Sequence, residues 1–520
     1  MYLCEYCGGK VTFDIKTQQI YCPFCGATKN PKDFEINDKT SAKEKIYMTN
    51  LFQCPHCGGE IISEDEEFTG YCPFCATYTT LQGRVSKENK PHYIIPFKIS
   101  KEECKNIFMK YVKGTKYAPK YLLDESCFDK FRAIYMPYWI YSTSQNSPIS
   151  IVGEISHNDD PSDYYEITGY AKGVCNGLSF DSSSNFEDDI SESIMPYETK
   201  DIKIFSPAYL IGFCANRCDV PPTVYCEELL DKINTRNIEE LNNIPQIKNS
   251  NIKSLSISNL TENIPTKIDK IESILYPVWF LSYRTKDDRI LYATINGQTG
   301  KMAMDIPISL SKYLLSSCIF TIPIFLLFLI LFFVFRNETN LFFNIMSYTI
   351  IMLSNLTMIF HSTQLYNIMD KQKKINDKGA LFKKSNNPFV KKEDTHGISV
   401  FAALGILFVV MLCSFEPLLF ESELVGVFFY FATVVVQWFA LIKMFIDRKK
   451  IKEKFSLLTD TFMCIANVIV FLFTLTNEPI LRIMPLSLLC FTNILVFFPL
   501  ISKYNEYCTR ILPQFKQKNK

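Results

Sequence analysis

The chain has 520 residues, of which 48% are hydrophobic and 21% charged, and its formal net charge is +1. This balance excludes a strongly basic or strongly acidic chain, and therefore gives no whole-chain electrostatic indication of a partner. The nineteen cysteines are an odd number, and the start Met1-Tyr-Leu-Cys4 leaves no room for a secretory leader. Both features predict reduced thiols and a cytoplasmic N-terminus.

One cysteine pattern, C-x2-C followed by fourteen residues and a second C-x2-C, occurs twice near the N-terminus. It is the ligand spacing of a four-thiolate zinc ribbon. The two-residue gap lets one tight turn present both sulfurs to an ion, and the insert has the length of a β-hairpin. We predict two structural Zn²⁺ ions, in a ribbon over residues 1–31 and another over 50–83. The predicted ligands are Cys4, Cys7, Cys22 and Cys25 in the first ribbon and Cys54, Cys57, Cys72 and Cys75 in the second.

The residues beside these cysteines agree with metal-binding turns. Gly8, Gly26 and Gly58 follow the second cysteine of their pairs, where a positive φ suits the turn, whereas Ala76 replaces glycine in the last pair. Ribbons this small need the metal for stability, about 10–16 kcal/mol per structural ion. Iron in a rubredoxin-like site and a redox dithiol are alternatives, but neither explains the tandem copy. With four thiolates per site, His56 is predicted to be an exposed turn residue.

Charge separates two uses of such ribbons. Residues 1–90 hold ten Lys and Arg against twelve Asp and Glu, and 63–67 is acidic. Binding to phosphates needs a basic surface, so nucleic acid remains the less favoured partner and a protein partner the more favoured one. Phe24, Tyr71 and Phe74 have rings that can stack on bases, although such aromatics more often cover the metal site.

The middle region, residues 91–310, is predicted to be α+β, after a polar linker at 84–90. Residues 93–97 predict a strand, Ser100 and Glu103 predict a capping box that opens a helix ending near Gly114, and 226–241 predicts a second helix. Residues 292–304 predict a hairpin with glycines in its turn. The acidic, serine-rich segments 157–161 and 181–189 are predicted to be solvated loops.

An internal repeat is suggested by two similar apolar segments. Ile134-Tyr-Met-Pro137-Tyr-Trp139 resembles Ile274-Leu-Tyr-Pro277-Val-Trp279, at an offset of 140 residues. We expect two related strands, within two similar α+β halves, and both tryptophans in the core. The common phosphate-loop, serine-hydrolase and zinc-protease motifs are absent, which favours a chain that is not an enzyme.

The C-terminal part predicts a membrane domain, residues 313–502, followed by a basic tail, 503–520. Six apolar runs approach or exceed the length that spans a bilayer: 313–335, 341–360, 398–415, 424–442, 461–477 and 483–502. Nineteen Lys and Arg in two loops and the tail, against Arg336 and Arg482 opposite, predict a multi-pass plasma-membrane protein with both termini in the cytoplasm. The lipid bilayer is then a partner, and the block is either an anchor or a transporter.

The order of these features resembles one bacterial family, the TFIIB-type zinc-ribbon-containing membrane proteins common in Firmicutes. The resemblance rests on the twin ribbons, Tyr93-Ile-Ile-Pro-Phe97, the two Pro-x-Trp strands, Ser206-Pro-Ala-Tyr-Leu210 and Asn296-Gly-Gln-Thr-Gly300-Lys301. It covers residues 1–310, and the apolar runs match only in kind. The resemblance implies cytoplasmic ribbons on a membrane anchor, with the eight cysteines above as ligands.

The sequence therefore predicts a multi-domain fold: two tandem β zinc ribbons, an α+β cytoplasmic region and an all-α six-span transmembrane bundle. The predicted function is a membrane-anchored zinc-binding adaptor whose ribbons and α+β region bind a protein partner at the inner membrane face. Nucleic-acid tethering and transport are the alternatives.

Overall fold

In the computed structural model, the described residues are 3–33, 46–64, 67–155, 163–244, 254–255, 264–334, 360, 363–364, 367–368 and 497–513. They form mostly β-sheet with few helices, in place of the predicted balance of an α+β region and an all-helical bundle. The described helices include α1 (Lys101–Gly114), α2 (Glu125–Phe128), α3 (Asp188–Ser193), α4 (Cys226–Asn243), α7 (Leu310–Val334) and a helix over residues 497–508.

A sheet of 13 strands forms most of the described fold. Its main path is β12-β9-β15-β10-β13-β5-β4-β8, with β11 and β14 on β10, β16 on β15, and β17 and β18 on β16. These strands are β4 (Ile46–Gln53), β5 (Glu60–Ser63), β8 (Arg84–Asn89), β9 (Tyr93–Ile94), β10 (Arg132–Ile155), β11 (Asp163–Asp181), β12 (Lys203–Ile204), β13 (Cys214–Asn216), β14 (Ser254–Leu255), β15 (Thr266–Arg284), β16 (Arg289–Asn296), β17 (Met302–Ala303) and β18 (Thr509–Ile511).

The two similar segments of the sequence are the centre of this sheet. They lie in β10 and β15, which pair antiparallel, with Pro137 opposite Leu275. The prediction of two strands is confirmed, but they are neighbours in one sheet rather than the centres of two similar halves. The Trp279 ring N–H donates to the Ile99 carbonyl (2.8 Å) and that of Trp139 to the Val220 carbonyl (2.9 Å), so both indoles bind the segments that cover the sheet.

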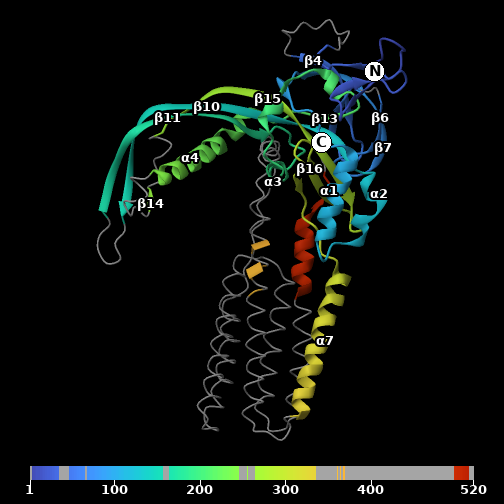
Figure 1. Cartoon of the computed structure of the whole chain (residues 1–520), viewed down its shortest axis with the longest axis vertical. Coiled ribbons are helices and arrows are strands. Elements are labelled where there is room, and N and C mark those ends of the chain that lie inside the picture. The colour runs from blue at the N-terminus through green and yellow to red at the C-terminus, as the bar shows by residue number, and fades with distance from the viewer. Residues whose placement is uncertain are drawn as a thin grey trace, which may run out of the picture.

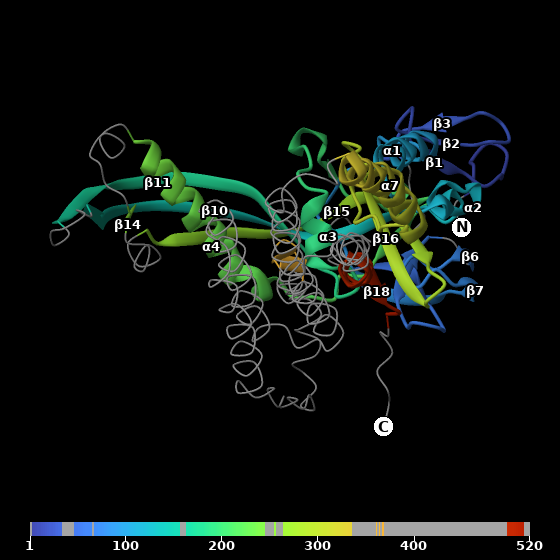
Figure 2. The same cartoon turned by 90° about the horizontal axis from the view of Figure 1, so that it is seen from below.

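β10 and β11 continue beyond the rest of the sheet as a long curved hairpin, with α4 along it (Figure 1). An apolar cluster of Tyr141, Phe180, Tyr225, Leu229 and Ile233 joins the helix to the strands. Figure 2 shows that the hairpin projects away from the end of the molecule that carries the first strands of the chain. The N-terminal cysteine sites and the outer part of β10 and β11 therefore lie at opposite ends of the described fold.

Local signals in the sequence placed several elements correctly. The side chain of Ser100 accepts from the Glu103 N–H, and the Glu103 carboxylate accepts from the Ser100 N–H, so the capping box at the start of α1 is confirmed. The predicted helix from Cys226 is α4. The predicted hairpin near 292–304 is β16–β17, in which Thr294 pairs with Ala303, and Gly300 adopts the positive φ of 76° that its turn requires.

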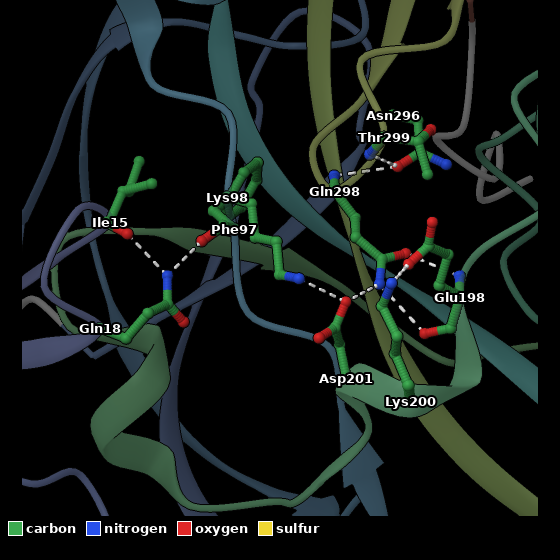
Figure 3. Close-up of polar contacts among 10 residues, drawn as sticks. All are labelled: Ile15, Gln18, Phe97, Lys98, Glu198, Lys200, Asp201, Asn296, Gln298 and Thr299. Carbon is green, nitrogen blue, oxygen red and sulfur yellow. Dashed lines mark hydrogen bonds and ion pairs between the residues drawn. The ribbon is translucent and has the colours of Figure 1, made fainter.

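The turn between β16 and β17 is also a structural junction (Figure 3). The Asn296 side-chain oxygen accepts from the backbone N–H groups of Gln298 and Thr299, both at 2.9 Å. The Gln298 side chain accepts from the Glu198 N–H (2.8 Å), and its amide donates to the Glu198 carbonyl (3.0 Å) and the Asp201 carboxylate. These contacts tie the Asn296-Gly-Gln-Thr-Gly300 motif to a neighbouring loop and account for it structurally.

Two polar segments differ from their predictions. Residues 84–90, predicted as a linker, contain β8, which pairs antiparallel with β4. Asp181, Ser182 and Ser183, predicted in a solvated loop, are at most 2% exposed. The Ser182 N–H donates to the Pro137 carbonyl (2.9 Å), and Asn216 donates its side-chain amide to the Ser183 hydroxyl (2.6 Å). Composition indicated solvent in both cases, whereas pairing across the sheet supplied the hydrogen bonds instead.

The segment after residue 502, predicted as a tail, returns to the sheet. Residues 497–508 are helical, and β18 then pairs antiparallel with β16, with Thr509 opposite Leu291. The Arg289 guanidinium donates to the carbonyls of Glu506 and Thr509, both at 2.9 Å, and Arg510 forms an ion pair with Glu187 (2.8 Å). The described part of this segment is therefore bound to the middle region of the chain.

The membrane prediction requires correction. Of the helices formed by the described residues, none is both long and apolar enough to cross a membrane. This finding contradicts the predicted six-span transmembrane bundle over 313–502 and the predicted multi-pass location in the plasma membrane. The predicted spans 341–360, 398–415, 424–442, 461–477 and 483–502 lie wholly or largely outside the described residues.

The remaining predicted span, 313–335, coincides with most of α7, and the start of α7 packs on protein. The Tyr117 hydroxyl lies 3.3 Å from that of Ser316, and the Lys312 ammonium donates to the Ala118 carbonyl (2.6 Å). The hydropathy of an apolar segment indicates that the segment is buried away from water, but it does not distinguish burial in a bilayer from burial against protein. For this reason the length of an apolar segment was not sufficient to predict a membrane span.

Candidate metal centres

Four tight turns, two in each ribbon, present the cysteines predicted as ligands. In every turn the first cysteine donates its backbone N–H to the carbonyl five residues on and accepts from the N–H four residues on. These bonds are 2.8–3.0 Å long. The positive φ predicted for Gly8, Gly26 and Gly58 is confirmed, at 70°, 75° and 79°, and Ala76 adopts the same conformation at 55°. The four turns therefore share one backbone geometry.

The strands that hold these turns differ between the ribbons. In the first ribbon, β1 (Thr12–Asp14), β2 (Gln19–Tyr21) and β3 (Thr28–Lys29) form a small separate sheet, with the predicted hairpin between the two turns. In the second ribbon, β5 instead pairs with β4 and β13 of the large sheet, while β6 (Glu67–Tyr71) pairs with β7 (Tyr78–Gln82). The second ribbon is thus built into the main sheet and its insert is split between two sheets.

The sulfur atoms of each ribbon are spaced as ligands of one ion. The Sγ atoms of Cys4 and Cys25 are 3.6 Å apart and those of Cys7 and Cys22 are 3.5 Å apart. In the second ribbon the Cys54–Cys75 and Cys57–Cys72 distances are 3.7 and 3.8 Å. A tetrahedral ion with metal–sulfur bonds of about 2.3 Å separates its sulfurs by about 3.8 Å. Each group of four cysteines can therefore hold one metal ion, and all four ligand atoms lie within 4.8 Å of one another.

Hydrogen bonds favour the thiolate form of Cys22 in the first ribbon and of Cys54 in the second, whereas hydrogen bonds from neighbouring thiols raise the pKa of Cys57 and Cys72. The Cys25 N–H lowers the pKa of Cys22 to about 7, and the neighbouring Cys57 thiol lowers the pKa of Cys54 to about 6. A thiolate is the ligand form of cysteine. His56, which lies between two ligands of the second ribbon, is exposed and outside the cluster, as predicted.

The first ribbon is anchored at its hairpin and open at its metal end. Phe13 and Ile20 are buried in the main core, where the Phe13 ring lies 5.5 Å from that of Tyr209. The Gln18 amide donates to the Phe97 carbonyl at 2.7 Å, a bond also drawn in Figure 3. In contrast, Cys7 and Cys25 are exposed. The rings beside them, Tyr6 and Phe24, are 81% and 75% exposed.

The metal site of the second ribbon is buried. Its four cysteines are at most 2% exposed, as is Phe74, and they share a cluster with Phe52 and Ile290. The Tyr292 hydroxyl donates to the Phe74 carbonyl (2.7 Å), and the Ser282 hydroxyl donates to the Pro73 carbonyl. Burial raises the pKa of Tyr292 well above its ordinary value, so that this hydroxyl stays protonated and can donate.

Ser282 and Tyr292 are site residues that sequence reasoning missed. Both lie more than 200 residues from the turn they bind, on β15 and β16. Ser282 follows Trp279 of the second Pro-x-Trp segment by three residues, as Ser142 follows Trp139 of the first. A single hydroxyl in an apolar strand gives no indication of its distant acceptor.

Comparison with known proteins identifies a relative. The chain is 30% identical to the protein YdjG of Bacillus subtilis (strain 168) over 318 residues, which is 60% of this chain and 91% of YdjG. The chain belongs to the YdjG family. YdjG is described as an uncharacterised protein, so membership of its family does not indicate an activity. No family model matches the chain, and no solved structure does.

Proposed function

We propose that the chain is a non-enzymatic zinc-binding adaptor that presents its first ribbon to a protein partner. Zinc is the proposed ion because four thiolates at tetrahedral spacing form a closed shell, typical of a structural zinc site. A closed shell leaves no ligand position for substrate or water. The two sites would then resemble ribbons of the TFIIB type, as the order of motifs suggests.

The observation that supports this proposal is that the metal end of the first ribbon is exposed, whereas the equivalent turns of the second ribbon are buried. The second ribbon is enclosed by the sheet, and the first ribbon is fixed by Phe13 and Gln18 while its metal end stays open. A rigid base with an exposed apolar tip is the form of a binding element, because little conformational entropy is lost when a partner covers it. Tyr6 and Phe24 supply the large aromatic surface found at the centres of protein interfaces.

Charge favours protein over nucleic acid as the partner. Residues 1–90 carry more Asp and Glu than Lys and Arg. Lys29, on β3 of the first ribbon, forms an ion pair with Glu5 (2.7 Å) and is thereby partly neutralised. A phosphate backbone binds surfaces with a net positive charge, which this region lacks.

The test is chemical crosslinking in cells followed by purification of the full chain, with and without nuclease. The native chain is compared with Cys22→Ser and Cys72→Ser, and the bound metal of each is measured by elemental analysis. Cys175→Ser, which removes a cysteine of β11 outside both clusters, is the matched control.

We expect two zinc ions in the native and control chains, and a nuclease-resistant protein partner that Cys22→Ser loses. Retention of every partner by Cys22→Ser would contradict the adaptor role. Recovery of nucleic acid through the first ribbon would replace it with nucleic-acid tethering. A metal other than zinc would refute the cofactor assignment alone.

A further inference from the structure

In both ribbons the turn that carries the third and fourth cysteine ligands has the same sequence, Tyr-Cys-Pro-Phe-Cys. It occupies residues 21–25 in the first ribbon and 71–75 in the second. The conformations of the two copies agree in detail. A Cβ atom on Gly9 would lie 2.5 Å from Cδ2 of Phe24, and a Cβ atom on Gly59 would lie 2.5 Å from Cδ2 of Phe74. Each phenylalanine ring therefore covers the glycine of the opposite turn in the same way, and the two pentapeptides present equivalent surfaces.

The second pentapeptide shows what this surface binds. It packs against β15 and β16, where Ser282 and Tyr292 are directly opposite each other across the two antiparallel strands. Their hydroxyls donate to two consecutive carbonyls, those of Pro73 and Phe74. Ile290, two residues before Tyr292, adds an aliphatic side chain to the same cluster. The binding face is thus a cross-strand pair of hydroxyl donors beside an aliphatic residue.

The first pentapeptide has the same surface without a binding face. Pro23, Phe24 and Cys25 are exposed, whereas Pro73, Phe74 and Cys75 are buried. Within the described part of the chain, no side chain donates a hydrogen bond to the carbonyl of Pro23 or Phe24. Residues 21–27 carry no charged side chain. Apart from its two cysteine ligands, the open surface is therefore uncharged, apolar and rich in acceptors.

We propose that the first pentapeptide binds the face of an antiparallel β-sheet in another protein. That face carries two hydroxyl side chains on neighbouring strands, next to an aliphatic side chain, as Ser282, Tyr292 and Ile290 do for the second pentapeptide. The inference rests on the proposed adaptor function and names the kind of surface that its partner presents.

The chemistry of the open carbonyls favours this occupant over two others. Phosphate oxygens accept hydrogen bonds and cannot satisfy the Pro23 and Phe24 carbonyls, which also only accept. A second copy of this chain has the required face, but its Ser282 and Tyr292 already bind its own Pro73 and Phe74. A distinct protein with a free face of this kind meets both requirements.

The experiment is photo-crosslinking of the full chain in its own cells, with p-benzoylphenylalanine in place of Phe24. The control position is Ile204, which is 74% exposed on β12, outside the first ribbon. Crosslinked peptides are mapped by mass spectrometry onto the structure of the captured protein. Affinity for that protein, once purified, is then measured for the native chain and Phe24→Ala.

We expect crosslinks from position 24 to a β-sheet face that carries a cross-strand pair of Ser, Thr or Tyr, and an affinity loss of about tenfold or more in Phe24→Ala. Removal of either hydroxyl of that pair is expected to weaken binding as well. Crosslinks to a helix, to nucleic acid or to a second copy, or none above the Ile204 position, would overturn the inference. If Cys22→Ser loses a partner that Phe24→Ala retains, the adaptor function stands and the sheet-binding inference fails.

Discussion

The two ribbons have the same ligand spacing, the same turns and the same sulfur geometry, yet opposite surroundings. All four cysteines of the second ribbon are buried, whereas two of the first ribbon are exposed. Phe74 is 1% exposed and its counterpart Phe24 is 75% exposed. The difference shows that cysteine spacing specifies a metal centre, while contacts with the rest of the chain decide whether that centre stabilises the fold or faces a partner.

The opposite ends of the ribbons explain how this division arises. The second ribbon places its metal end against β15 and β16, and its β5 continues the large sheet through β13. The first ribbon places its hairpin against the core and leaves its metal end outside.

Removal of one cysteine ligand is expected to produce the largest difference in stability between the two ribbons. We expect Cys75→Ser to lower the free energy of unfolding by about 5 kcal/mol, because it removes a metal ligand and places a hydroxyl in an enclosed apolar cluster. Cys25→Ser, its exposed counterpart, is expected to cost about 1–2 kcal/mol, since the first ribbon alone is affected. Urea unfolding followed by circular dichroism measures both. Equal losses would show that the ribbons contribute alike to stability.

Truncation of the matched phenylalanines tests burial without touching a ligand. Phe74→Ala is expected to destabilise the chain by about 3–5 kcal/mol, because a buried ring leaves a cavity. Phe24→Ala is expected to change stability by less than about 0.5 kcal/mol, because its ring is mostly in water. Thermal and urea unfolding provide the measurement. A large effect of Phe24→Ala would mean that the first ribbon is covered.

Removal of one hydroxyl tests the polar contact that encloses the second ribbon. Tyr292→Phe leaves the buried Phe74 carbonyl without its donor and is expected to cost about 1–3 kcal/mol. Tyr170→Phe is the control, because this exposed tyrosine donates to Asn146 on β10 of the long hairpin. The free energy of unfolding in urea is measured for both variants. A Tyr292→Phe chain as stable as the control would remove the hydroxyl contact from the explanation.

Thiol reactivity compares the ribbons within a single molecule. After metal removal, we expect N-ethylmaleimide to modify Cys7 and Cys25 about tenfold faster or more than Cys57 and Cys75, because modification of the second ribbon requires opening of its enclosure. Burial raises the pKa of Cys127 to about 12, so this thiol is an internal slow standard. Mass spectrometry of digested samples over time gives each rate. Simultaneous modification would indicate that both ribbons unfold together.

Local sequence signals predicted the parts of the fold that local chemistry controls. The eight cysteines with their glycines gave the four turns, Ser100 and Glu103 gave the start of α1, and Gly297 and Gly300 gave the turn of β16–β17. Each of these features depends on residues within about five positions of one another. Their energies are short-range, so neighbouring residues suffice to predict them.

Features that depend on distant pairing were predicted poorly. The polar residues of β8 form a strand because they pair with β4, and buried Ser182 and Ser183 form hydrogen bonds with Pro137 and Asn216, which are distant in the sequence. The apolar run at 313–335 indicated burial, but its neighbours could not be derived from hydropathy. For the same reason, the contacts of Ser282 and Tyr292 with the second ribbon could not be predicted from the sequence.

The two four-cysteine centres can be predicted from the sequence, because ligand spacing and turn-forming residues are encoded locally. The two long strands that bear Trp139 and Trp279 can be predicted as well, since their apolar runs favour a buried sheet. Three features depend on tertiary contacts: these strands pair with each other, the metal site of the second ribbon is buried, and that of the first ribbon is exposed. Those outcomes depend on which surfaces meet, and residues more than 200 positions apart supply the decisive hydrogen bonds.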